Sequence, residues 1–231
     1  MKKCIVLFSG GIDSTTALYW ALKRYQKVQA LTFDYGQRHR LEVTMAKNIT
    51  QKLKVPLKII QIDLRQIGGS SLTDSHYPLP QFNTHQEIGN EPPSTYVPFR
   101  NGILLAMAAA WAETKGIKDI ICGFNIIDSP HYPDTREEFV AAMEKAINAG
   151  TKASLTQDKF HLLSPFINLR KSEIIKEGLS MGADYSLSIS CYRGQEVPCQ
   201  KCSSCLLRQK AWQEVGLPDP LIIRLKKEGK L

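Results

Sequence analysis

Six residues near the N-terminus, residues 9–14 (SGGIDS), constrain the fold more than any other stretch of the chain. The apolar run 4–8 (CIVLF) precedes them, and a helical pattern over residues 15–22 follows. A strand, a glycine turn and a helix N-terminus in this order form an anion site, because unpaired N–H groups and the positive end of the helix dipole face the bound group. The stretch therefore predicts a phosphate site at the end of a strand.

The residues within this stretch refine the prediction. Paired glycines let the main chain approach an anion closely, whereas the Gly-Lys-Ser/Thr ending of a Walker A loop is absent. Asp13 is a carboxylate beside the expected phosphates and would be repelled by them without a cation, so we expect it to contact Mg²⁺. The alternative is a tight turn with a serine cap, but the position between strand and helix favours the phosphate site.

The glycine stretch resembles the pyrophosphate loop of the N-type ATP pyrophosphatases. Members of that superfamily cleave ATP between the α- and β-phosphates and adenylate a substrate oxygen. The resemblance implies ATP as a co-substrate, bound by the loop and the first turns of the helix. The expected ATP contacts are Phe8, Ser9, Gly10, Gly11, Ile12, Asp13, Ser14, Thr15, Thr16, Ala17 and Leu18.

The rest of the chain alternates between apolar runs and helical patterns. Three strand patterns separated by two helical ones within the first 62 residues predict an α/β fold with a parallel, Rossmann-like sheet. Ligands of such sheets bind outside the carboxyl ends of the strands, where the glycine loop and residues 34–39 (DYGQRH) would both lie. There Arg38 and His39 either face ATP or substrate or belong to a solvated helix turn. The expected strands are 4–8, 28–33, 57–62, 119–124 and 162–167, and the expected helices are 14–26, 41–53, 102–114, 137–147, 171–176 and 206–214.

Length and charge indicate how the chain is organised. Its 231 residues predict a main domain over 1–185 and a small helical subdomain over 186–231. The longest apolar run, 103–112, is shorter than the roughly 20 residues that span a bilayer, and no targeting segment is evident, so we expect a cytoplasmic protein. The net charge of +8 is unevenly spread, and about half of it lies in 186–231. A basic end of this kind can attract nucleic acid, ATP or an acidic partner, and it is also common in solvated tails.

A second constellation consists of four cysteines close together near the C-terminus. Four thiolates suit a closed tetrahedral Zn²⁺ site, although such sets also hold iron–sulfur clusters. Disulfides are not expected in a cytosolic chain. We therefore predict a structural metal site that fixes residues 190–195 and the following helix, while Cys4 and Cys122 lie in strand patterns and belong to the core. The predicted metal ligands are Cys191, Cys199, Cys202 and Cys205.

Polar residues in two other loops would reach the same edge of the sheet. Arg100 lies at the start of a buried helix, and because an unpaired buried guanidinium is costly we expect it to bind a phosphate or carboxylate. Asn101 either caps that helix or contacts the substrate. The loop 125–136 carries Asp128, Tyr132, Asp134 and Arg136, which would suit a polar heterocycle. Alternatively, Asp134 and Thr135 form the start of the next helix together with the acidic residues 137–138.

Two further features stay ambiguous at this point. Lys171 opens a helical pattern and is either a phosphate contact or a solvated lysine. Residues 68–98 are rich in proline and weakly periodic, which is typical of a functional lid, an interface arm or a disordered segment.

Taken together, these segments resemble one family of the superfamily, the 7-cyano-7-deazaguanine synthases of queuosine-precursor biosynthesis. The pyrophosphate loop indicates only the superfamily, whereas the cysteine block and YVPFRN together indicate this family. Phe99, Thr135 and residues 129–131 depart from its pattern. The matching segments cover essentially the whole chain: 9–16 (SGGIDSTT), 34–39, 96–101 (YVPFRN), 132–136 (YPDTR) and 190–208 (SCYRGQEVPCQKCSSCLLR).

The resemblance implies a specific reaction. An ATP-dependent ligase would convert 7-carboxy-7-deazaguanine and ammonia to the 7-cyano product through an adenylated carboxylate and then an adenylated amide, releasing AMP and pyrophosphate. It also implies Mg²⁺, zinc on the four cysteines, a homodimer, and neither a membrane nor a nucleic-acid partner. Asp13, Arg100 and Lys171 would act in catalysis, and the substrate would contact Tyr96, Arg100, Asn101, Asp128, Tyr132, Asp134 and Arg136.

Two alternatives remain open. A tRNA-thiolating enzyme of the same superfamily would use cysteines to carry sulfur or an iron–sulfur cluster, but only Cys4 and Cys122 lie outside the predicted ligand set. A non-enzymatic zinc-ribbon module would bind nucleic acid through the basic C-terminus. That reading leaves residues 9–14 unexplained, and the basic residues lack the interleaved aromatics of a stacking platform.

Overall fold

A five-stranded parallel sheet forms the centre of the molecule, in the order β3-β2-β1-β4-β5. The computed structural model describes residues 1–89, 92–127 and 132–231. Ile5 of the central strand pairs with Gln29 on one side and with Ile120 on the other. The parallel α/β sheet expected from the sequence is therefore confirmed. Its strands are β1 (Lys3–Leu7), β2 (Lys27–Asp34), β3 (Leu57–Gln61), β4 (Asp119–Ile121) and β5 (His161–Leu163).

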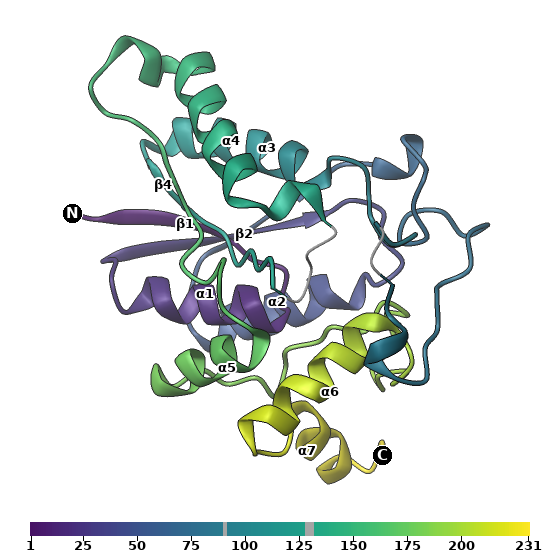
Figure 1. The fold of residues 1–231 in the computed structure, drawn as a ribbon. Helices are drawn as coiled ribbons and strands as arrows, with labels where there is room; N and C mark the ends of the chain where they lie inside the picture. Colours follow the sequence, from purple (N-terminus) through teal and green to yellow (C-terminus); the bar gives the residue numbers. More distant parts are fainter. Residues whose placement is uncertain (90–91, 128–131) are drawn as a thin grey trace.

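Helices cover both faces of the sheet (Figure 1). Helices α1 (Ile12–Leu22), α2 (Leu41–Lys52) and α5 (Lys171–Ser180) lie on one face, and α3 (Arg100–Lys115) and α4 (Glu137–Gly150) lie on the other. Helices α6 (Ser203–Val215) and α7 (Pro220–Lys227) follow, with α6 packed on α5. The chain proceeds from β1 toward β3 and then crosses to β4, so the strand order reverses beside β1. Ligands of open α/β sheets bind outside the strand ends at such a switch point.

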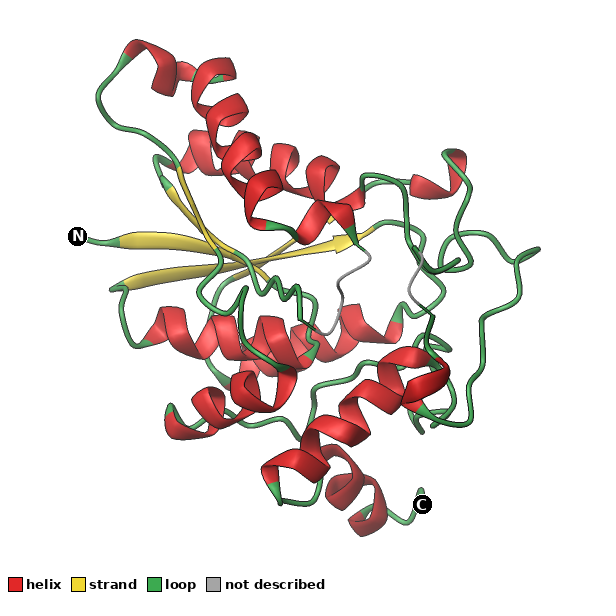
Figure 2. Cartoon of the chain, viewed as in Figure 1, coloured by secondary structure: helices red, strands yellow, loops and turns green. Residues whose placement is uncertain are grey.

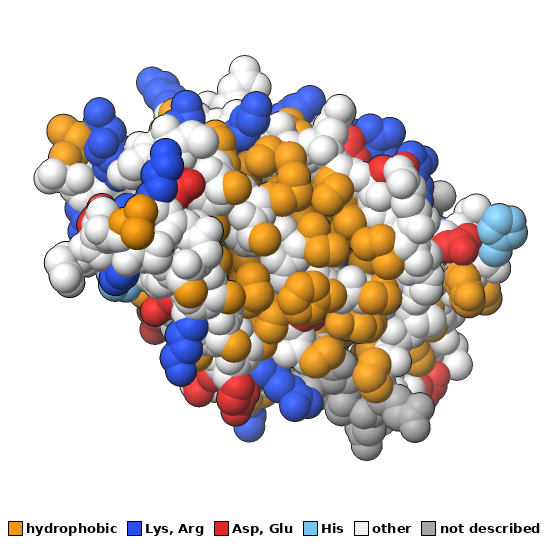
Figure 3. All heavy atoms as spheres, turned by 90° about the horizontal axis from the view of Figure 1, so that it is seen from above, with side chains coloured by type: hydrophobic (Ala, Val, Ile, Leu, Met, Phe, Trp, Pro, Cys, Tyr) orange, Lys and Arg blue, Asp and Glu red, His pale blue; other side chains and the backbone are white. Residues whose placement is uncertain are grey.

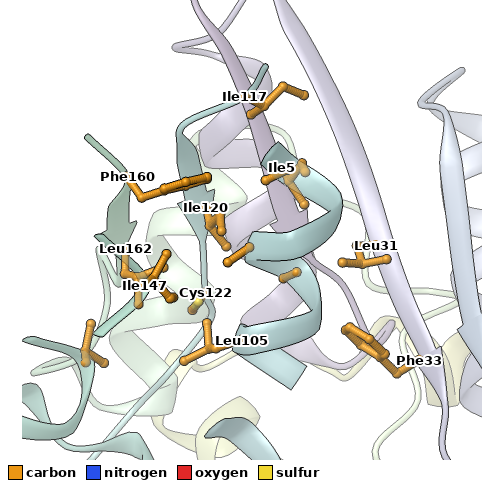
Figure 4. Close-up of a cluster of buried hydrophobic side chains, with 14 of the residues drawn as sticks. Ile5, Leu31, Phe33, Leu105, Ile117, Ile120, Cys122, Ile147, Phe160 and Leu162 are labelled. Atoms are coloured by element: carbon orange, nitrogen blue, oxygen red, sulfur yellow. The ribbon is translucent and has the colours of Figure 1, made fainter. Parts of the chain in front are cut away.

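Two apolar clusters fill the layers above and below the sheet. One joins the sheet to α3 and α4, and Figure 4 shows Ile5 of β1, Leu105 of α3 and Ile120 of β4 within it. The other joins the sheet to α1, α2 and α5 through residues such as Val6 and Leu18. Because both faces are covered, the strands read as continuous apolar runs instead of alternating patterns.

The C-terminal region contains a helix that periodicity had not indicated. Helix α7 occupies residues 220–227, in the basic region for which a solvated tail was one expectation. Asp219 caps it by accepting a hydrogen bond from the N–H of Leu221 at 2.9 Å, and Leu221 and Leu225 are buried. The helix has only eight residues and two buried side chains, which is too short a pattern to predict a helix from the sequence.

Other element boundaries differ modestly from expectation. Helix α1 begins at Ile12, because Gly10 adopts a left-handed φ of 84° and makes Gly11 the N-cap, so Asp13 belongs to the first turn. Strand β4 ends at Ile121 and not at residue 124. No helix of the described chain is long and apolar enough to cross a membrane.

Residues 68–89 and 92–98 are mostly loop (Figure 2), interrupted by a short 3-10 turn over His85–Glu87. The N–H of Phe82 donates to the carbonyl of Lys201 at 2.8 Å. The long loop is therefore attached by a backbone hydrogen bond to the region that carries the cysteines.

Candidate active site

A cavity of about 310 Å³ lies at the carboxyl ends of the central strands. Its walls include Leu7 and Phe8 after β1, Phe33 and Tyr35 of the β2 end, and Gly123 after β4. A cavity of this size suits a small-molecule ligand. It lies at the switch point of the sheet, where the topology places a binding crevice.

The glycine loop forms one wall of the cavity. A Cβ atom on Gly10 would lie 3.2 Å from both the N of Ala46 and the carbonyl of Glu42, so this glycine allows α2 to pack against the loop. Gly11 makes no side-chain cap, and the first N–H groups of α1 have no partner within the helix. The hydroxyls of Ser9 and Ser14 lie 3.1 Å apart and add donors beside those N–H groups. The arrangement is an anion site of the kind found at helix N-termini.

Gly123 has a function that the sequence did not reveal. A Cβ atom at this position would lie 2.8 Å from backbone atoms of Asp13 and Ser14. The absence of a side chain lets the end of β4 lie directly against the first turn of α1. The cavity floor is therefore made by two segments that are distant in the sequence.

Asp13 and Lys171 form an ion pair inside the cavity. The ammonium nitrogen of Lys171 lies 2.6 Å from Oδ2 of Asp13, although the residues belong to α1 and α5. Their side chains are 23% and 17% exposed, so Lys171 is not a solvated lysine. The structure therefore brings a cation and a carboxylate together beside the anion site.

Arg100 also reaches the cavity, from the first turn of α3. Its guanidinium donates a hydrogen bond to the Tyr35 hydroxyl at 3.2 Å and lies over the Tyr35 ring. The N-cap of the helix is Phe99, in a left-handed conformation, so a capping role for Asn101 is wrong. Asn101 instead donates its backbone N–H to the Asp134 carboxylate at 2.9 Å and its side-chain amide to the Asp134 carbonyl at 3.0 Å.

Of the other predicted substrate contacts that the structure describes, only Tyr132 lines the cavity. Its hydroxyl lies 2.9 Å from that of Thr95. Tyr96 packs edge-on against Tyr132 and accepts a hydrogen bond from the Phe99 N–H, behind the cavity wall. Asp134 is buried within a 3-10 turn, and Arg136 is the exposed N-cap of α4, so the interpretation that Asp134 and Thr135 start this helix is wrong. Asp128 lies outside the described residues.

Part of the predicted ATP contact set supports the loop from behind. Thr15, Thr16, Ala17 and Leu18 are fully buried, and the Thr16 hydroxyl bonds to that of Tyr185 at 2.7 Å. Among residues 8–18, those that line the cavity are Phe8, Ser9, Gly11, Ile12, Asp13 and Ser14.

The turn after β2 places different residues at the cavity and away from it. Arg38 points elsewhere, because its guanidinium donates to the carbonyls of Asp74 and Tyr77 and holds the long loop. His39 lines the cavity, packed against the rings of Tyr35 and Tyr192. Burial lowers the pKa of His39 below its ordinary value of 6.5, so its imidazole is neutral at neutral pH.

Several cavity residues had no signal of their own in the sequence. Glu42 lies within a helical pattern that otherwise looked purely structural, and Tyr192 follows the metal-ligand candidate Cys191 directly. Phe124 and Asn125 follow β4 and line the cavity at the edge of the sheet where the loop 125–136 was expected. Leu72 and Ile189 also line the cavity without a signal in the sequence, whereas Ser190 and Ser204 belong to the matching segment 190–208.

The four C-terminal cysteines come together in space as the sequence predicted. Their sulfur atoms all lie within 4.8 Å of one another. The N–H groups of Cys199 and Cys202 donate to the sulfurs of Cys191 and Cys199, each at 3.3 Å. Four thiols at this spacing cannot all ionise unless a cation lies among them, because like charges so close together disfavour ionisation. This donor set is compatible with zinc.

The cysteine cluster is connected to the cavity through its own loop. Tyr192 lines the cavity, and a Cβ on Gly194 would lie 2.6 Å from the Cα of His39. Cys4 and Cys122 are both fully buried, as predicted for core residues, and burial raises the pKa of the Cys4 thiol to about 12. Neither of these two cysteines is available as a reactive thiolate.

Comparison with known proteins gives a consistent result. The family model described as "Queuosine biosynthesis protein QueC" matches residues 3–216. A 7-cyano-7-deazaguanine synthase of Thermoplasma volcanium is 45% identical over 221 residues, which are 95% of this chain and 90% of that protein. A protein of the same name from a Psychrobacter species is 44% identical over 228 residues, 95% of this chain and 89% of that one.

Solved structures share the fold at lower sequence similarity. A 4-thiouridine synthetase in complex with RNA and bound ATP matches 99% of this chain with a TM-score of 0.51 and 22% identity. The chain spans about half the length of that protein, 53%. At this identity the likeness establishes a common fold and nothing about the reaction.

Proposed function

The chain belongs to the QueC family of queuosine biosynthesis proteins, and from this premise we propose that it converts 7-carboxy-7-deazaguanine, ammonia and ATP to 7-cyano-7-deazaguanine. One observation carries the assignment of the site: the Asp13–Lys171 pair lies beside the glycine loop in the cavity at the strand ends. A nucleotide triphosphate and a carboxylate substrate both need cationic and N–H partners, and this cavity offers both kinds.

The first half of the reaction makes the carboxylate reactive. A carboxylate oxygen is a poor leaving group, so ammonia cannot displace it directly. Attack of a substrate carboxylate oxygen on the α-phosphorus of ATP forms an acyl adenylate and releases pyrophosphate. Ammonia then forms the C–N bond as the C–O bond to AMP breaks, giving the amide. The N–H groups of the α1 first turn, with Lys171 and Arg100, would stabilise the charge that develops on the phosphate.

The second half removes the remaining oxygen. The amide oxygen attacks a second ATP, and pyrophosphate leaves again. In the resulting adenylated amide the C–O bond to AMP breaks, and the nitrogen releases both of its protons. The product is the nitrile. Because both halves adenylate an oxygen on the same carbon, one anion site at the α1 N-terminus serves both.

Two metal ions belong to this proposal. The Asp13 carboxylate in the α1 first turn would hold Mg²⁺, which neutralises phosphate charge in phosphoryl and nucleotidyl transfer. Zinc would be held by the four cysteines as a structural ion outside the cavity. We also propose that the chain consists of a domain of residues 1–185 and a zinc subdomain of residues 186–231. The proposed location of the protein is the cytoplasm.

Product analysis tests the proposed reaction. Purified protein is incubated with Mg-ATP, ammonium and 7-carboxy-7-deazaguanine, and the products are identified by mass spectrometry. We expect the nitrile to form together with AMP and pyrophosphate. Formation of ADP and phosphate in their place would contradict adenylation, and substrate-independent turnover would contradict the substrate assignment.

The thiolation alternative makes different demands on the cysteines. A sulfur-carrying cysteine must be accessible and ionised, whereas Cys4 and Cys122 are fully buried. The remaining four cysteines form one closed cluster. The described chain thus supplies no cysteine suited to carry sulfur, which supports the nitrile-forming reaction over thiolation.

We further propose that the protein is a homodimer that associates through the outer faces of α3 and α4. Figure 3, seen from above, shows a broad apolar area on this side of the molecule. Continuous apolar areas of this kind mark interaction sites, and two-fold dimers are the commonest oligomers. The apolar face comprises Ile103, Met107, Ala110, Trp111, Phe139 and Met143, all exposed or only partly buried.

The dimer proposal predicts the effect of one charge. Ala110 is exposed in the monomer, so Ala110→Glu leaves the fold intact but places a carboxylate without a partner in the interface. We expect sedimentation equilibrium to report a dimer for the unmodified protein and a monomer for this variant. Leu217→Glu, at an exposed apolar residue after α6, is the control and should remain dimeric. A monomeric unmodified protein would refute the proposal.

A further inference from the structure

Glu42 is a carboxylate at the cavity wall to which the proposed reaction gives no role. It lies in the first turn of α2, lines the cavity, and its side chain is 15% exposed. Two neighbours hold its two oxygens: Nε2 of Gln37 donates to Oε1 at 3.0 Å, and Nε2 of His39 lies 3.4 Å from Oε2. The carboxylate is therefore held in a defined orientation at the cavity wall.

Gln37 is itself fixed by the backbone of β2. Its amide oxygen accepts the N–H of Tyr35 at 2.7 Å, and its amide nitrogen also donates to the carbonyl of Phe33 at 3.2 Å. The Gln37 side chain is buried. The turn after β2 thus orients Glu42 by hydrogen bonding, as residues around a metal site orient the metal ligands that they contact.

The charge on Glu42 requires a partner. Among the described cavity-lining residues the carboxylates are Asp13 and Glu42, and Asp13 is paired with Lys171. No lysine or arginine of the described chain forms an ion pair with Glu42, and the His39 imidazole beside it is neutral. A partly buried carboxylate beside a site for anions is unfavourable unless a cation joins it.

We infer that Glu42 binds ammonium and removes a proton from it, so that ammonia is generated beside the acyl adenylate. This inference rests on the proposed function, in which ammonium is the cationic substrate. At neutral pH ammonium has no lone pair on nitrogen and cannot attack. Glu42 supplies both an attractive charge for the cation and a site for the proton.

The proton transfer balances as follows. Ammonium gives one proton to the Glu42 carboxylate, which becomes neutral, and the lone pair of ammonia forms the C–N bond. The electron pair of the broken C–O bond leaves with AMP, and the nitrogen releases its second proton to solvent. Glu42 then returns its own proton to solvent. The transfer converts two charges into two neutral groups, which the partial burial of the Glu42 side chain favours.

Two nitrogen nucleophiles separate this role from a structural one. Hydroxylamine is neutral at pH 8 and reacts with an acyl adenylate without prior deprotonation, giving a hydroxamate. Glu42→Gln preserves shape and the Gln37 contact but removes the charge. With Mg-ATP and 7-carboxy-7-deazaguanine, we expect this variant to lose about 100-fold in kcat/KM for ammonium, within the range of general-base effects. Its rate of hydroxamate formation should be nearly unchanged.

The matched control is Asp34→Asn. Asp34 lies at the end of β2, is 13% exposed and pairs with Arg40 outside the cavity lining, so its loss should leave the ammonium dependence unchanged. Equal losses with ammonium and hydroxylamine in Glu42→Gln, or no loss with either, would overturn the role of Glu42. Absence of both pyrophosphate and hydroxamate with the unmodified protein would instead refute the proposed function.

Discussion

Replacement of Asp13 by Asn is expected to lower kcat/KM by about 100-fold or more, with the protein still folded. The substitution keeps the shape of the side chain but removes the charge at the first turn of α1, 2.6 Å from Lys171. Without that charge the cation expected between Asp13 and the phosphates is lost. Losing one preorganised electrostatic partner of a transition state typically lowers kcat by about 10²–10³. Initial rates of pyrophosphate release measure the effect.

Two comparisons isolate the cause of this loss. Asp63→Asn removes a carboxylate from another ion pair, that of Asp63 with Arg65 at 2.7 Å, which does not line the cavity, and should leave the rate unchanged. A double variant with Lys171→Met tests whether Asp13 only orients the lysine. If the double variant is no slower than Lys171→Met alone, the metal-binding role proposed for Asp13 is contradicted.

Replacement of Cys202 by Ser is expected to remove the bound metal and to lower thermal stability. Loss of an outer-sphere contact already weakens metal binding by about 10–100-fold, so loss of a ligand should have a larger effect. Structural zinc contributes about 10 kcal/mol or more to folding in isolated finger peptides. Even a fifth of that, about 2 kcal/mol, would lower Tm by about 4–8 °C in a chain of this size. Elemental analysis and thermal unfolding measure the two effects.

The same substitution is expected to affect the cavity indirectly. Tyr192 and Gly194 follow a metal ligand and contact the His39 turn, and the long loop is attached at Lys201. Loss of metal should therefore raise the KM for substrate as well as lower Tm. Cys122→Ala, at a buried cysteine outside the cluster, is the control and should retain the metal. A Cys202→Ser protein with full zinc content would contradict the ligand assignment.

The sequence was sufficient for the sheet because its signals are local. Each strand is an apolar run bounded by a turn, and the glycine stretch identifies the strand end at which a ligand binds. The four-cysteine cluster was predictable for the same reason, since its members are close in the chain. Helix α7 was missed because it has only eight residues and buries only Leu221 and Leu225, so its apolar pattern in the sequence is short.

The site was less predictable because its contacts cross between distant segments. Asp13 and Lys171 are separated by 158 residues, and no local pattern indicates that their side chains meet. Likewise Asn101 looked like a helix cap, yet it binds Asp134 because Phe99 takes the left-handed cap position. Glu42 resembled any acidic residue in a first helical turn until Gln37 and the cavity were placed beside it.

Oxygen transfer tests the central claim most directly. 7-Carboxy-7-deazaguanine labelled with ¹⁸O in both carboxylate oxygens is incubated with the protein, unlabelled ATP and ammonium. The masses of the nucleotide products are then measured by mass spectrometry. Two adenylations on one carbon predict two AMP molecules per nitrile, each carrying one ¹⁸O on its phosphate. Label in inorganic phosphate with ADP as the nucleotide product, or label released only as water, would contradict adenylation at the α1 N-terminus.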